Sequence, residues 1–413
     1  MSALDRPHHL PEVLAAAKQD QDSVLALTRE LVAIPSRGGI DPYDGVLDTV
    51  RAWLSDHGLD TKTLTDATGA PVGLTCEIRG AHPGPRWVLD ACLDTAPFGD
   101  ADAWTYPPTS ATVADGWLHG RGAADSKVGA AIFCHIAARL APVAAHLHGT
   151  LVLLFDVDEH TGGFGGAKAY FDGPHAPDDV AGVMIGYPGM AKVVVGGRGV
   201  YRTRLHVHGV SSHSGGSKTS PSAIEKAAHL VRTLSTADLP DGAGPAFPLP
   251  GKLTVTAMRG GEGFSVTPDL CVLNVDIRTT PIFDAAAAET LLRERVSHVD
   301  HDWPDTPPTD IRLDTCWPAY ALDDQSPLRT ALLSAARAAG VEPTAKIAGP
   351  SNIGNYLAGL GIPATAGFGV TYTGLHATDE RLQIDTIPTV QAAYHAAVYA
   401  LLTTAAADGR PPR

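Results

Sequence analysis

The chain has 413 residues, of which 44% are hydrophobic and 18% charged, a composition typical of a globular protein with two domains rather than one. Its 31 basic and 45 acidic residues give a formal net charge of −14 without clustered Lys and Arg, which argues against a nucleic-acid partner. The start lacks a cationic segment followed by a long apolar one, and no uninterrupted apolar stretch approaches membrane length. We therefore expect a cytoplasmic protein with no membrane partner.

The first 195 residues alternate between predicted helices and predicted strands. Apolar spacing predicts a helix over 23–32 that ends at Ile34, because the following proline disfavours helix. Two further helices are predicted over 46–57 and 128–140, and short apolar strands over 72–78, 87–93 and 149–157. This alternation is typical of an α/β layer with a mixed sheet.

From about Gly196 the pattern changes to that of a smaller domain. The segment YRTRLHVHGV alternates like a half-exposed strand, KLTVTAM and CVLNVDIR are further strands, and helices are predicted over 221–234 and 285–296. Residues 196–315 thus have the contents of a two-layer α+β domain. A helix over 327–339 and the buried strand IPATAGFG then resume the first pattern. The larger domain is therefore predicted to be discontinuous, with residues 1–195 and 316–413.

Polar residues in Gly-rich or strand-end segments suggest a metal site. Asp125, His160 and His376 supply two histidines and one carboxylate, which suffice for a catalytic Zn²⁺ and leave one position open for water or substrate. Glu159, next to a ligand in the chain, could take the proton of that water. Taken singly, each residue is more often a strand-end polar group that satisfies a hydrogen bond.

Six segments together resemble one family. The six segments are WVLDACLDTAP, LHGRGAADSKVGA, FDVDEHTGGFGGAK, GVSSHSGG, SVTPDLCVLNVDIR and GLHATDERLQID. Their order and spacing resemble those of the M20 metallopeptidases, which include aminoacylases, carboxypeptidases and dipeptidases. The resemblance covers nearly the whole chain. It implies a zinc-peptidase-like α/β catalytic domain with a mixed sheet, interrupted by a smaller α+β lid domain that forms the dimer contact. It also implies a homodimer that hydrolyses an amide bond in a small molecule or peptide.

The metal-ligand positions only partly follow the family. Its usual dinuclear site draws on a His two residues before an Asp, a bridging Asp, a Glu-Glu pair, a further acidic residue and a late His. The matching positions are Asp94, Asp125, Glu159 and His376. Cys92 replaces the first His, His160 the second Glu, and Tyr187 the further acidic residue. Cys92 and Tyr187 would both serve one metal, so that half of the site is altered while the other half keeps three ligands.

The preferred hypothesis is one Zn²⁺ per chain at Asp125, His160 and His376, with Glu159 as general base. A dinuclear site that also uses Cys92 and Tyr187, and a metal-free protein, both stay open. Mn²⁺ or Co²⁺ in place of Zn²⁺ also stays open, because affinity order and availability both decide which metal is bound.

Two further residues are assigned roles, and two other functions stay open. Asp94 is two residues beyond Cys92, so on a strand both side chains would point to one face, and it is expected to support the site. The resemblance matches His213 to a lid histidine that stabilises the oxyanion, often from the neighbouring subunit. As alternatives, the chain could bind an amino-acid-derived ligand without hydrolysis, or use Cys92 as the nucleophile of an acyl-transfer or amide-forming reaction.

Overall fold

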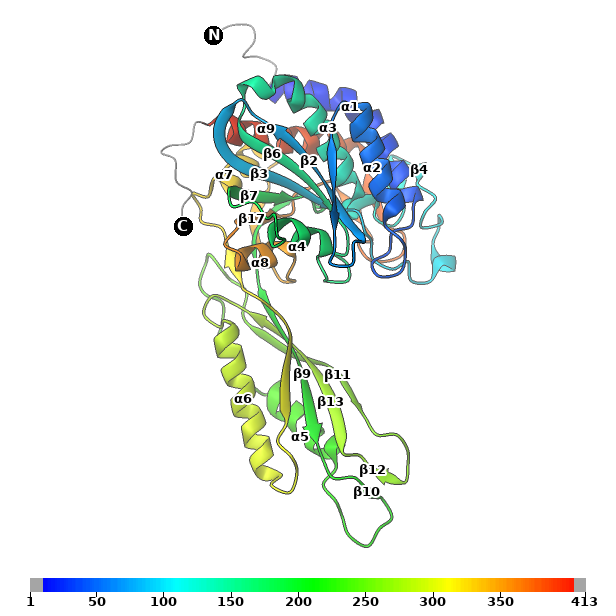
Figure 1. The fold of residues 1–413 in the computed structure, drawn as a ribbon, viewed down its shortest axis with the longest axis vertical. Helices are drawn as coiled ribbons and strands as arrows, with labels where there is room; N and C mark the ends of the chain where they lie inside the picture. The colour runs from blue at the N-terminus through cyan, green and yellow to red at the C-terminus, as the bar shows by residue number, and fades with distance from the viewer. Residues whose placement is uncertain (1–9, 405–413) are drawn as a thin grey trace. The chain divides into compact units, whose positions relative to one another are not determined.

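The computed structural model describes residues 10–404, which fold into two compact units (Figure 1). Unit 1 comprises residues 10–195, Leu322–Lys346 and 361–404, and unit 2 comprises Gly196–Ala321 and Ile347–Leu360. Unit 2 therefore extends beyond the predicted boundary at residue 315 and includes a second, later segment. That segment is held by Asn355, whose Nδ2 donates to the carbonyls of Arg198 (3.0 Å) and Pro318 (2.8 Å).

Unit 1 is built on a six-stranded mixed sheet, as the sequence predicts for an α/β layer. The strand order is β1-β2-β6-β3-β7-β17; the pairs β1–β2 and β2–β6 are antiparallel, whereas β6, β3, β7 and β17 run parallel to one another. The bounds are Thr61–Thr65 (β1), Pro71–Arg79 (β2), His82–Cys92 (β3), His148–Asp156 (β6), Val180–Ile185 (β7) and Ala364–Ala366 (β17). In the parallel pair, Cys92 lies opposite Asp156, so β3 and β6 end at the same edge of the sheet.

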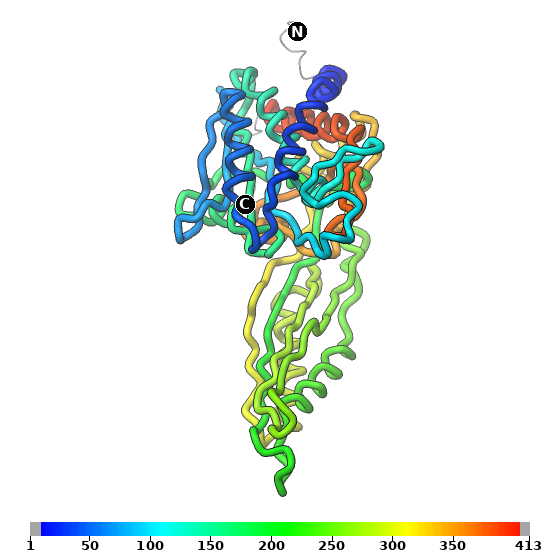
Figure 2. Tube along the Cα trace, turned by 90° about the vertical axis from the view of Figure 1, so that its right-hand side faces the viewer, coloured from blue at the N-terminus to red at the C-terminus, as the bar shows by residue number. Residues whose placement is uncertain are grey.

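Among the described residues, six α-helices belong to this unit. Their bounds are Leu10–Ala33 (α1), Asp44–Asp56 (α2), Val128–Leu140 (α3), Gly165–Phe171 (α4), Pro327–Ala338 (α7) and Ile387–Thr403 (α9). Helices α3 and α9 contact β3 and β6, and α1 packs on both helices; α1 is blue and α9 red in Figure 2. Almost every α3 side chain is buried, since the helix is apolar on all sides.

One helical stretch in the part of the chain that the structure describes, Ala123–His146, is long and apolar enough to cross a membrane. Of its most apolar window, 61% is buried inside the protein, which is the pattern of a core helix. It is not uninterrupted in sequence, because it begins with the polar residues Asp125, Ser126 and Lys127.

A small four-stranded sheet in unit 1 joins distant parts of the chain near the predicted ligands. Its order is β18-β19-β5-β4, and the bounds are Tyr372–Thr373, Arg381–Gln383, Trp117–His119 and Thr112–Ala114. Strand β5 leads into the short helical segment η3 (Ala123–Lys127), and β18 and β19 flank the loop that carries His376. Because β5 pairs with β19, the segments around residues 120 and 380 lie side by side.

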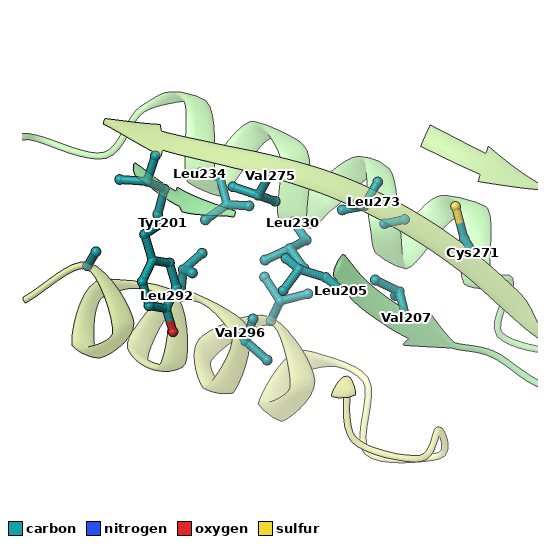
Figure 3. Close-up of a cluster of buried hydrophobic side chains, with 14 of the residues drawn as sticks. Tyr201, Leu205, Val207, Leu230, Leu234, Cys271, Leu273, Val275, Leu292 and Val296 are labelled. Atoms are coloured by element: carbon teal, nitrogen blue, oxygen red, sulfur yellow. The ribbon is translucent and has the colours of Figure 1, made fainter. Parts of the chain in front are cut away.

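Unit 2 is a four-stranded antiparallel sheet covered by helices. The order is β11-β13-β9-β14, with bounds Lys252–Gly260, Leu270–Thr279, Gly199–His208 and Asp310–Trp317. Along β13 buried and half-buried residues alternate, so one face carries the core, as expected for a two-layer domain. Helices α5 (Ala223–Ser235) and α6 (Ala285–Asp302) pack there, and Figure 3 shows Leu230 of α5 and Leu292 of α6 in the same buried cluster as Leu205 and Leu273 of the sheet.

The remaining elements are short. In unit 2 they are β10 (Ser212–His213), β12 (Val266–Thr267), β15 (Tyr320–Ala321) and α8 (Ile353–Gly359). Unit 1 adds the 3-10 turns η2 (Ala101–Ala103), η4 (Ala141–His146) and η5 (Ile384–Thr386), while β8 (Lys192–Gly197) and β16 (Thr344–Ala348) lie where the chain passes between units.

Candidate metal centre

The three predicted ligands come from three separate segments of unit 1. Asp125 lies in η3, His160 follows the end of β6 by four residues, and His376 lies in the loop between β18 and β19. His376 adopts a positive φ of 57°, a backbone conformation that non-glycine residues adopt infrequently. The loop therefore fixes the direction of this side chain through an uncommon backbone geometry.

The donor atoms of these three residues converge. The Oδ2 atom of Asp125 lies 2.9 Å from Nε2 of His376 and 3.5 Å from Nε2 of His160. One donor atom from each residue lies within 4.8 Å of the other two. Ligands about 2.0–2.1 Å from a tetrahedral Zn²⁺ lie roughly 3.4 Å apart, so shifts of an ångström or less would complete the geometry. The residues present therefore fit a metal ion.

Asp94 holds the turn that carries His160. Its Oδ1 and Oδ2 atoms accept the backbone N–H groups of Glu159 (3.1 Å) and His160 (2.9 Å). Oδ2 also lies 3.3 Å from Nδ1 of His160, close but without the alignment of a hydrogen bond. The ring thus directs Nδ1 toward Asp94 and Nε2 toward Asp125, the arrangement in which an outer carboxylate orients a metal-binding imidazole. Asp94 is fully buried and positions the turn that carries His160.

The cluster is strongly coupled electrostatically. Burial disfavours the imidazolium of His160, but Asp125 and Asp94 outweigh it and raise the pKa of His160 to about 11. Burial also opposes ionisation of Asp125, yet His160 and His376 hold the pKa of this carboxyl well below its usual range. Asp125 therefore stays an anion between two histidines.

Glu159 and Tyr187 form a second contact beside these donors. The hydroxyl of Tyr187 donates to Oε1 of Glu159. Burial, followed by the charge of Asp125, raises the pKa of Glu159 to about 7. Burial and then Glu159 raise the pKa of Tyr187 well above its ordinary value, so Tyr187 stays a neutral phenol that donates a hydrogen bond and is not an anionic ligand.

Cys92 lies at the end of β3 with 2% of its surface exposed. Its sulfur lies within 4.8 Å of donor atoms of Asp125 and Glu159, and in another set of Asp94 and His160. Burial and then Glu159 raise the pKa of the Cys92 thiol well above its ordinary value. Because the thiolate is the nucleophilic form, this environment disfavours the alternative in which Cys92 starts an acyl transfer.

His213 lies in unit 2, exposed on β10. Its Nδ1 accepts the backbone N–H of Gly215 at 3.0 Å. A neutral imidazole that accepts at Nδ1 carries its proton at Nε2, so His213 presents an N–H donor. Its predicted part in oxyanion stabilisation stays a prediction.

Four buried ionisable residues at or behind the site were not predicted. Arg121 and Glu380 form a buried ion pair beside Asp125 and His376. Asp90 and Asp156 are fully buried near Glu159, and burial raises the pKa of both carboxyls well above the usual value. A signal for the first pair is present in the motifs GRGAAD and HATDE, where a charged residue lies four positions from each ligand.

A cluster of metal-ligand residue types on an α/β unit, interrupted in sequence by an antiparallel α+β unit, is the plan of a metal-dependent hydrolase. The chain belongs to peptidase family M20/M25/M40, whose model matches residues 88–400, and whose members cleave C–N bonds with bound metal. This confirms the predicted family and fold class, and the hydrolase activity as a class.

Sequence relatives and solved structures agree with this assignment. Succinyl-diaminopimelate desuccinylase of Cereibacter sphaeroides is 30% identical over 282 residues, covering 67% of this chain and 72% of the relative. The Bordetella petrii protein of the same name is 27% identical over 92% of this chain and 98% of its own length.

Among solved structures, a Staphylococcus aureus tripeptidase has a TM-score of 0.72 at 19% identity, covering 92% of this chain and 98% of its own. A Bacillus subtilis dinuclear metal binding peptidase of family M20 has a TM-score of 0.70 at 16% identity, covering 94% of this chain and all of its own. At these identities the structures show the shared fold alone.

Proposed function

We propose that this chain hydrolyses the amide bond of a small peptide or N-acyl amino acid with one Zn²⁺ held by Asp125, His160 and His376. The convergence of these three donors around Oδ2 of Asp125, at 2.9 and 3.5 Å, is the observation that carries the proposal. When bound, such an ion acts as a Lewis acid and lowers the pKa of its water toward about 7.

Glu159 is the proposed general base. It adjoins the ligand His160 in sequence, and its raised pKa of about 7 is suited to taking and returning a proton near neutral pH. Its Oε1 receives the hydroxyl of Tyr187, while Oε2 receives no hydrogen bond from the residues described between 10 and 404. Oε2 is therefore the oxygen available to take the proton of the attacking water and deliver it to the leaving nitrogen.

The proposed stoichiometry of one metal per chain rests on Tyr187 and Cys92. A dinuclear site of the family's usual kind needs ligands at both positions. Here the phenol of Tyr187 donates a hydrogen bond to Glu159, and burial raises the pKa of both this phenol and the Cys92 thiol. Both groups would have to lose a proton in a buried, negatively charged environment before binding a second ion, which disfavours a second site.

Elemental analysis of the purified protein, after loosely bound ions are removed, tests this stoichiometry. We expect close to one metal per chain, lost in His160→Ala and retained in Glu159→Gln. Two metals per wild-type chain would refute the single-ion proposal, and full occupancy in His160→Ala would refute the ligand set.

Turnover is the second test. Sequence relatives carry the name succinyl-diaminopimelate desuccinylase, and one structural relative is described as a tripeptidase. N-succinyl and other N-acyl amino acids, dipeptides and tripeptides are therefore the substrates to screen first. We expect Glu159→Gln to lower kcat by about 10²–10⁴-fold with metal still bound. Saturable binding of these compounds without metal and without turnover would instead support a binding protein.

We further propose that the chain is a homodimer and that His213 donates from Nε2 to the developing oxyanion. The family resemblance and the hydrogen bond from Gly215 to Nδ1 support this role. His213→Ala should lower kcat by about 10²–10³-fold without changing the metal content. Light scattering of the purified protein gives the mass in solution, and a monomer with full activity would exclude a role that needs two subunits.

A further inference from the structure

Arg121 and Glu380 connect the two segments that carry Asp125 and His376 in a reciprocal way. Arg121 lies four residues before Asp125, and its Nη2 donates to the carbonyl of Ala377, the residue after His376 (3.0 Å). Glu380 lies four residues after His376, and its Oε1 accepts the backbone N–H groups of Ala124 (3.2 Å) and Asp125 (3.4 Å). Each residue thus binds the backbone beside the other segment's ligand.

The two side chains also bind each other. Nη1 of Arg121 donates to Oε2 of Glu380 at 2.6 Å, and the backbone N–H of Gly120 donates to the Glu380 carbonyl at 3.0 Å. The Arg121 guanidinium lies over the ring of Trp104, 5.2 Å from its centroid. The side chains of Arg121 and Glu380 are 2% and 1% exposed. The connection is therefore rigid and shielded from water.

Stability alone is a poor explanation for this pair. Two charges removed from water carry a desolvation cost that their attraction often only offsets, and apolar residues of similar volume are frequently as stable. The planar guanidinium and the carboxylate do have a property that apolar residues lack, because each presents several hydrogen-bonding atoms in fixed directions. Here those atoms form hydrogen bonds with the backbone of Ala124, Asp125 and Ala377.

We propose that Arg121 and Glu380 are positioning residues that set the separation of Asp125 and His376 for metal binding. This inference rests on the proposed metal site. His160 is independent of the pair, because its turn is held by Asp94, which follows the end of β3. Loss of the pair should therefore weaken metal binding by misplacing two of three ligands, and outer partners of metal ligands typically change metal affinity by about 10–100-fold.

The test compares Glu380→Leu, which removes the acceptor oxygens, with the double variant Arg121→Met/Glu380→Leu, in the full chain. The single variant leaves an unpaired buried charge and should lower the thermal midpoint of the metal-free protein. The double variant removes that charge, so its midpoint should recover toward the wild-type value. Zn²⁺ titration calorimetry should nevertheless give about 10–100-fold weaker binding for both, and the visible absorption bands of bound Co²⁺ should shift in both.

Lys226→Met is the matched control. Lys226 is fully buried in unit 2 and pairs with Asp300 at 2.7 Å, away from any proposed ligand in sequence and in unit. It should lower the thermal midpoint and leave the Zn²⁺ affinity unchanged.

The outcomes separate the two proposals. A double variant that binds Zn²⁺ as tightly as wild type, with unchanged Co²⁺ bands, would overturn the positioning role while leaving the metal site intact. A wild-type chain that binds no metal in the same calorimetry would overturn the proposed function itself, and the positioning role with it.

Discussion

The carboxylate of Asp94 secures the turn of Glu159 and His160, and its removal is the most direct perturbation of the site. Asp94→Ala deletes two hydrogen bonds from backbone N–H groups, at 3.1 and 2.9 Å, to a charged acceptor. Such bonds contribute about 1.5–3 kcal/mol each. Because both donors are only partly buried, we expect the unfolding free energy to fall by about 2–5 kcal/mol.

The same substitution releases the His160 ring, whose Nδ1 lies 3.3 Å from Asp94. We therefore expect metal affinity to fall by about 10–100-fold as well. Urea unfolding of the metal-free protein measures the first effect, and Zn²⁺ titration calorimetry the second. Asp94→Asn keeps an acceptor oxygen and loses the charge, so it should lie between wild type and Asp94→Ala in both measurements.

Asp66→Ala is a suitable control. Asp66 also accepts two backbone N–H groups, from Thr68 (2.8 Å) and Ala70 (3.0 Å), but in an exposed turn of the same unit. Its loss should destabilise the protein less than the loss of Asp94 and leave metal binding unchanged. Asp94→Ala with wild-type stability and wild-type Zn²⁺ affinity would refute the reasoning.

Three further predictions concern the surroundings of the site and the two cores. Gly38 lacks room for a larger side chain, since a Cβ there would lie 3.1 Å from Asp94 Oδ2 and 3.3 Å from the Cβ of His160; Gly38→Val should weaken Zn²⁺ binding, whereas unchanged calorimetry would contradict the packing argument. Burial raises the pKa of Cys76 from about 9 to about 11, so its stabilising effect is complete below pH 9 and is lost as the pH rises to about 11. In urea unfolding, wild type should lose more stability than Cys76→Ala over that window, on the order of 2 kcal/mol, and equal losses in the two proteins would argue against the shifted pKa. Leu273 is fully buried in the core of unit 2, and Leu273→Ala should lower stability by about 2–5 kcal/mol, seen as faster hydrogen exchange of unit 2 amides.

The sequence predicts elements best where one segment's own pattern decides the structure. The helix predicted over 128–140 is α3, with the same bounds, because its apolar Ala-rich stretch needs no particular partner. The helix predicted over 23–32 begins instead at Leu10. A polar run, KQDQDS, separates the predicted part from the first residues of α1, whose buried Val13 and Ala17 pack on Ala392, near the other end of the chain. Such a contact has no local signature.

In the candidate site, too, the sequence predicts individual residues better than it predicts the contacts between distant segments. Family spacing points to Asp125, His160 and His376, and the structure brings their donor atoms together. The pairing of Arg121 with Glu380 spans 259 positions, and no periodicity connects them. The contact between Tyr187 and Glu159 likewise arises only where the sheet brings their segments together. Motif spacing can mark Arg121 and Glu380 as candidates beside the ligands, but which residues contact each other is a property of the folded unit.

The discontinuity of unit 1 has a consequence for how the protein is made. Asp125 and His160 precede unit 2 in the chain, whereas His376 follows 216 positions after His160. At a synthesis rate of roughly 5–20 residues per second, His376 is added to the chain ~10–40 s after His160. During that interval β17 and α9 are also absent, so the sheet has an open edge and α3 lacks a packing partner. A nascent chain stopped after unit 2 should therefore hold zinc far more weakly than the finished protein.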